Sequence, residues 1–159
     1  MELIPTTLIR NNARCKDCDH RFTVYTFSDF EYGRRLGRTP DPQELGLMDC
    51  FNDMVFQEVG DLVDQFLKPL GEEWKRAQCF DSVFGVACDP APSGYRYDFT
   101  GRIPCPICGS SNVSYGPDDL PQVEILDLAP VTHNAWQQLS YEDKQEQLQE
   151  ALWKAGCLP

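Results

Sequence analysis

The residues of this chain best suited to chemistry are two cysteine pairs, Cys15-Lys-Asp-Cys18 and Cys105-Pro-Ile-Cys108. A Cys-x-x-Cys turn presents two sulfurs to one point, with backbone amides directed at them, and two such turns supply the four thiolates of a closed tetrahedral zinc site. The spacing therefore predicts that Cys15, Cys18, Cys105 and Cys108 bind one structural Zn²⁺ ion. Four thiolates also suit iron, so the sequence leaves zinc and iron open.

The residues that flank both pairs are typical of metal knuckles. Residues 21–25 (Arg-Phe-Thr-Val-Tyr) alternate as a strand does, and Gly109 can adopt the positive φ that folds amides back toward sulfur. In these residues the chain resembles the zinc-ribbon and rubredoxin-like knuckle families, over about residues 13–25 and 102–114 only. The resemblance implies a metal-stabilised fold and no particular activity. The chain departs from the pattern at Asp19, where such knuckles usually carry glycine.

Other roles for the cysteines are less well supported. A redox dithiol would need one pair at a strand-to-helix junction and would leave the second pair unexplained. Residues 1–7 contain no basic region and no long apolar run, so we expect no export signal and a reducing, cytoplasmic location. We therefore predict that Cys50, Cys79, Cys88 and Cys157 are free thiols. A second metal site at Cys79 and Cys88 has little support, because neither belongs to a knuckle.

Signatures of catalysis are missing from the sequence. It contains no phosphate-binding glycine loop, no nucleophile elbow and no His-Glu-x-x-His motif. We interpret the only histidines, His20 and His133, as ordinary polar residues, with His20 as a candidate substitute ligand or supporting group. Four thiolates would close the metal to water, so we expect no enzyme. An active site around Trp74 and Cys79 is the remaining enzymatic alternative.

Between the knuckles, about residues 39–94 predict a mainly helical insertion. Residues 39–42 (Thr-Pro-Asp-Pro) resemble a turn and helix start, with Asp41 as the cap and Pro42 in the first helical position. Apolar residues at helical spacing from Val55 to Leu70 predict an amphipathic helix of about four turns. A shorter helix is expected at residues 72–77.

The remaining elements complete an α+β prediction. A strand at residues 95–99 should lead into the second knuckle, and short strands at 112–115 and 123–126 are separated by 116–119. A C-terminal helix, about residues 140–155, should begin at the Ser140 cap with Asp143 and present a solvated acidic face. We thus expect one domain, residues 1–159, in which a small zinc-ribbon-like β element carries the helical insertion and the C-terminal helix.

Charge favours a protein partner over nucleic acid. The net charge is −11, and after residue 38 the chain has seven basic and twenty acidic side chains. An acidic body repels phosphate, and no run approaches the ~20 apolar residues that span a bilayer. We interpret the protein as a non-catalytic binder of a partner, itself basic, of the acidic inhibitor or immunity/antitoxin type. The sequence leaves the oligomeric state open.

The runner-up is a nucleic-acid-binding zinc ribbon. It would use a basic and aromatic set at the first knuckle and in the 32–38 loop: Lys16, Arg21, Tyr25, Tyr32, Arg34, Arg35 and Arg38. The competing interpretation of this loop is a solvated connection whose arginines pair with the acidic body, which we favour.

Overall fold

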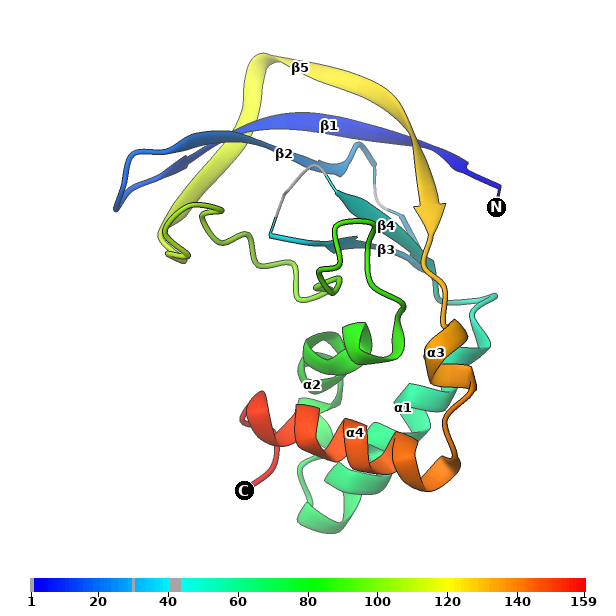
Figure 1. The fold of residues 1–159 in the computed structure, drawn as a ribbon. Coiled ribbons are helices and arrows are strands. Elements are labelled where there is room, and N and C mark those ends of the chain that lie inside the picture. The colour runs from blue at the N-terminus through cyan, green and yellow to red at the C-terminus, as the bar shows by residue number, and fades with distance from the viewer. Residues whose placement is uncertain (1, 30, 41–43) are drawn as a thin grey trace.

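The protein folds into a curved five-stranded sheet with the helices grouped on one side of it (Figure 1). This computed structural model describes residues 2–29, 31–40 and 44–159. The strands are β1 (Ile4–Cys15), β2 (Arg21–Phe27), β3 (Arg34–Arg38), β4 (Leu45–Asp49) and β5 (Val113–Pro130). The helices are α1 (Met54–Leu67), α2 (Arg76–Val83), α3 (Asn134–Gln137) and α4 (Tyr141–Lys154), with short 3₁₀ turns at Lys68–Leu70, Glu73–Lys75 and Phe84–Ala87. The predicted α+β class and C-terminal helix are confirmed.

The sheet has the order β2-β1-β5-β4-β3, so the two edge strands are β2 and β3. β1 is antiparallel to both β2 and β5, whereas β4 joins β5 in parallel only at Gly46–Ala129 and Leu47–Pro130. The two edge strands lie within reach of one long side chain, since Arg38 Nη2 on β3 donates a hydrogen bond to the Tyr25 carbonyl of β2 at 2.7 Å. The concave side encloses a small apolar cluster: Leu8, Leu36, Leu45, Leu47 and Leu128.

A second, larger core lies among the helices. It contains Val59, Leu62 and Val63 of α1 together with Leu148 and Leu152 of α4, all essentially buried. Asp53 caps α1 by accepting from the amides of residues 55 and 56, and Ser140 caps α4 as predicted by accepting from the amide of residue 143. The two helices therefore bury the apolar stripes that the sequence indicated.

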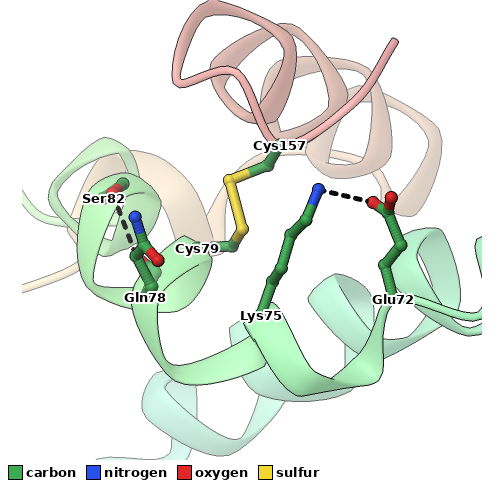
Figure 2. Close-up of a disulfide and its surroundings, with 6 residues drawn as sticks. All are labelled: Glu72, Lys75, Gln78, Cys79, Ser82 and Cys157. Atoms are coloured by element: carbon green, nitrogen blue, oxygen red, sulfur yellow. Dashed lines mark hydrogen bonds and ion pairs between the residues drawn. A yellow bond between two sulfur atoms is a disulfide. The ribbon is translucent and has the colours of Figure 1, made fainter.

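A disulfide closes the helical part of the molecule. Figure 2 shows Cys79 of α2 joined to Cys157, which follows α4 near the C-terminus. The prediction of free thiols is therefore wrong for Cys79 and Cys157, whereas Cys50 and Cys88 are free. The sequence argument failed because it inferred the redox state from the N-terminus, while the folded chain brings two distant residues, 78 positions apart, into contact. Disulfides persist mainly in oxidising surroundings, so this one does not support the cytoplasmic location, which stays a prediction.

Several elements differ from the prediction. Residues 95–99 form no strand but a single bridge between Asp98 and Arg38, and the alternation there arises because Tyr97 and Phe99 pack into the helical core. The strands expected at 112–115 and 123–126 are parts of one strand, β5, whose register with β1 breaks at residues 118–121. The insertion contains strand β4 in addition to its helices, and the supposed loop 32–38 contains another strand, β3.

The helix start predicted at Asp41 and Pro42 lies outside the described residues, and the next described element is strand β4. In the part of the chain that the structure describes, no helix is long and apolar enough to cross a membrane.

Candidate metal centre

The sheet brings the two cysteine pairs to the same place. Cys15 is the last residue of β1, Cys18 lies in the turn that leads to β2, and Cys105 and Cys108 precede β5. At this end of the sheet Cys15 is opposite Val113, and the amide of Lys16 donates to the carbonyl of residue 112 at 2.9 Å. Pairing of β1 with β5 therefore places two knuckles that are far apart in sequence side by side.

The two knuckles share one backbone conformation. In the first, the amide of Cys15 donates to the His20 carbonyl and the amide of Asp19 donates to the Cys15 carbonyl, both at 2.9 Å. In the second, the amide of Cys105 donates to the carbonyl of residue 110 and the amide of Gly109 donates to the Cys105 carbonyl, again both at 2.9 Å. Each knuckle thus turns its two sulfurs inward by the same hydrogen bonds.

Asp19 adopts the backbone conformation that glycine adopts in the other knuckle. Gly109 has φ 73°, as the sequence predicted, and Asp19 has φ 63°. Asp19 is the only non-glycine residue with a positive φ in the described part of the chain. An L-residue pays a steric cost in this left-handed region, although Asp tolerates it better than most. The departure at Asp19 therefore leaves the shape of the knuckle intact.

The four sulfurs converge as a tetrahedral metal site requires. Cys15 Sγ lies 3.6 Å from Cys108 Sγ, Cys18 Sγ lies 3.6 Å from Cys105 Sγ, and all four lie within 4.8 Å of one another. Zn–S bonds of about 2.3 Å in a tetrahedron place neighbouring sulfurs about 3.8 Å apart. Cys15, Cys18, Cys105 and Cys108 can therefore hold a metal ion with little rearrangement.

Backbone amides prepare the cluster to carry negative charge. Burial opposes ionisation of Cys105, but hydrogen bonds from the amides of Cys108 and Ile107 and from neighbouring thiols lower its pKa to about 7. The amide of His20 favours the Cys18 thiolate, yet desolvation and the surrounding sulfurs raise the pKa of Cys18 to about 12. These amides favour thiolates, the form in which cysteine binds a metal ion, and the charge of a bound dication would favour ionisation of the cluster further.

Polar contacts also join the two knuckles directly. The Asp17 carboxylate accepts hydrogen bonds from the Ser110 hydroxyl and from Asn112 Nδ2, the latter at 3.2 Å. These two hydrogen bonds lower the pKa of Asp17, because they favour its charged form. The sequence offered no sign of this link, since Asp17 is one of many acidic residues and its partners lie more than ninety positions away.

The other residues singled out by the sequence lie elsewhere. His20 does not belong to the sulfur cluster, and its ring stacks on Phe22 at 5.7 Å between centroids. Cys79 is held in the disulfide, so it cannot form a second metal site with Cys88. Within the described residues, the four knuckle cysteines are the only convergent group of three or more His, Cys, Asp or Glu ligand atoms.

His133 is a buried structural residue that the sequence analysis undervalued. Its Nε2 lies 2.6 Å from Asp53 Oδ2 and its Nδ1 lies 2.7 Å from the Ala87 carbonyl oxygen. Burial lowers the pKa of His133, but these acceptors outweigh burial and raise it above its usual value. Both ring nitrogens face acceptors, an arrangement that favours the doubly protonated imidazole, and the two contacts tie the start of α3 to the start of α1.

Comparison of the chain with protein-family models, with curated protein sequences and with solved structures finds no significant match.

Proposed function

We propose that this protein is a non-catalytic zinc-binding protein that acts by binding another protein. The observation that carries the proposal is the convergence of four cysteine sulfurs within 4.8 Å at the end of the sheet. Four thiolates fill the coordination sphere of Zn²⁺ and leave no position for a reacting water, which is the arrangement of structural sites. The ion then fixes the ends of β1 and β5, as in a zinc ribbon, and the surrounding surface performs the function.

The surface favours a basic partner. The α4 helix exposes the acidic side chains of residues 142, 143, 146 and 150, and the whole chain carries a net charge of −11. The ion pair of Glu150 with Lys154, at 3.0 Å, balances only one of these four carboxylates within that helix. Complementary charge speeds association and selects partners. We therefore propose an inhibitor or immunity-type protein that covers a cationic site on its partner.

Contacts of the basic residues argue against the nucleic-acid alternative. Arg35 pairs with Asp81, and the Arg38 guanidinium donates to the Tyr25 carbonyl. The Tyr25 hydroxyl donates to Glu124 at 3.0 Å and its half-buried ring packs against the small apolar cluster, so little of the ring is available for stacking on a base. Arg35 and Arg38 thus take part in the fold, although their segment is strand β3 and not the solvated connection that the sequence analysis favoured.

The test has two parts. Elemental analysis of the purified protein should find one zinc per chain, and removal of the zinc should lower the melting temperature. Immobilised zinc-loaded protein should retain a protein partner from an extract of the organism that encodes it, with retention that weakens as salt rises. A nucleic-acid mobility shift at low salt, together with failure to retain any protein, would refute the proposed function in favour of the alternative.

A further inference from the structure

Strand β5 leaves most of one edge unpaired. Its first side pairs with β1 from Val113 to Leu128, apart from the register break, whereas its second side pairs with β4 only at Ala129 and Pro130. No other strand pairs with β5 among the residues that the structure describes. Figure 1 shows β5, in yellow, as the outermost strand, arching over β1.

The hydrogen-bond pattern shows which peptide groups face this edge. The Ser28 amide donates to the Thr7 carbonyl at 3.3 Å, so the peptide groups of Thr7 face β2 and not β5. Ile125 is opposite Thr7 in the ladder. Because the peptide groups of Thr7 face β2, Thr7 and Ile125 form a non-hydrogen-bonded pair, and in such a pair each residue directs its own N–H and C=O away from the other strand. Val131 lies an even number of residues after Ile125, so its peptide groups face the same side of the strand. Its amide donates to the Leu47 carbonyl of β4 at 2.9 Å, which confirms that this side is the one away from β1. The N–H and C=O groups of Val123 and Ile125 therefore face the open edge.

The side chains beside this edge are apolar and exposed. Leu120 is 85% exposed, Ile125 70% and Val123 57%. Ile9 of β1 lies opposite Val123 and extends the apolar strip across the outer face of the sheet. Contiguous exposed apolar side chains beside unpaired strand groups characterise a site where another strand adds.

We propose that an extended, basic segment of a partner protein binds along residues 122–127 of β5 and extends the sheet by a strand. This inference rests on the proposed function and specifies the surface that it uses. Three exposed carboxylates, those of Asp118, Asp119 and Asp127, flank the segment. Lysine or arginine near the ends of the incoming strand would face these carboxylates, and apolar side chains between them, on the same face of the strand, would cover Val123 and Ile125.

The same carboxylates disfavour pairing with a second copy of this chain in the register centred on Val123. Antiparallel self-pairing with a two-fold axis at Val123 would place Asp119 opposite Asp127, and like charges directly opposite destabilise a strand pair. Pro117 and Pro121 lack amide donors and protect the other end of the strand from pairing. The accessible edge is thus short and selects a cationic strand.

A synthetic strand tests the proposal on the full-length, zinc-loaded protein. The probe is a fluorescent peptide of about nine residues, with two lysines at each end and valine alternating with threonine between them, a length within the usual range for strands. A control peptide of equal charge carries two adjacent prolines at its centre, which removes donors from both edges. We expect the probe to bind the protein and to slow deuterium uptake over residues 122–127. Its affinity for the protein should be at least about tenfold higher than that of the proline control.

Variants separate this edge from general charge attraction. Ile125→Lys should weaken probe binding at least about tenfold, because it puts a cation on the apolar strip. Met54→Lys adds the same charge at a side chain that is 86% exposed on α1, and it should leave the affinity unchanged. Equal weakening by both variants, protection of a different segment, or equal binding of both peptides would overturn the inference. A natural partner that binds the Ile125→Lys protein as tightly as the wild type would also overturn it while leaving the proposed function standing.

Discussion

Replacing Cys105 by serine should release the metal and open one end of the sheet while the helices stay folded. The sulfur pairs at 3.6 Å are already close to tetrahedral spacing, so little of the binding energy is spent on rearrangement. Structural zinc contributes an apparent 10 to 16 kcal/mol, roughly the whole stability of an ordinary domain. Without it the knuckles keep the hydrogen bonds of Asp17 to Ser110 and Asn112, each worth about 1 kcal/mol. These bonds cannot replace the ion.

The helices should survive this change because they have their own core and their own cross-link. The buried residues of α1 and α4 form a cluster separate from that of the sheet, and the Cys79–Cys157 disulfide closes it. Hydrogen–deuterium exchange should therefore rise over residues 13–25 and 102–117 and stay unchanged over α1, α2 and α4.

Elemental analysis gives the matching measurement. The Cys105→Ser protein should lose most of its zinc, whereas Cys50→Ser, which removes a free thiol outside the cluster, should keep it. Full zinc content and unchanged exchange in Cys105→Ser would refute the assignment of these sulfurs as the metal site.

Three further predictions concern the knuckles, the disulfide and pH. Asp19→Gly should raise the free energy of unfolding by about 0.5 kcal/mol, since relief of the left-handed strain exceeds the loss of an exposed ion pair. Gly109→Asp should lower the free energy of unfolding by about 1 kcal/mol. A lower melting temperature for Asp19→Gly, or a higher one for Gly109→Asp, would contradict the shared knuckle geometry. Cys157→Ser opens a loop of 78 residues and should cost about 4 kcal/mol, measured by denaturant unfolding, with no further loss on adding reductant. The folded-state pKa of His133 is raised above the unfolded value of 6.5, so its contribution is complete below that pH and is lost as pH rises through the folded-state pKa. The stability difference between wild type and His133→Gln should accordingly shrink with rising pH, and a constant difference would show that Asp53 does not hold a charged imidazole.

Local patterns were readable from the sequence. The Cys-x-x-Cys turns, the glycine at Gly109 and the cap at Ser140 depend on residues within a few positions of one another. The α1 helix was equally clear, because its apolar stripe has a period that only a helix satisfies. The two Cys-x-x-Cys turns alone identified the candidate metal site before any tertiary information.

Strand β1 was missed for a physical reason. Its buried residues have even numbers up to Leu8 and odd numbers from Asn11, because the register with β5 shifts between Arg10 and Asn11. One of the buried residues, Asn11, is polar and satisfies its amide by donating to the Val24 carbonyl at 3.1 Å. A strand that changes parity and buries a polar side chain shows no period of two over its length.

The same register break gives β5 its exposed character. Residues 118–121 have no partner on β1, so the strand bends there and its two halves follow different courses. Pairing with Cys15 holds the first half at Val113, beside the cysteine cluster, and β4 holds the second half at Ala129. The stretch between these two supports is fixed at both ends and unpaired along one edge. A strand held in place before binding loses less conformational entropy when a partner adds to it. The cysteine cluster and the open edge are therefore connected: a metal ion held by the four sulfurs would preorganise the surface proposed to bind the partner.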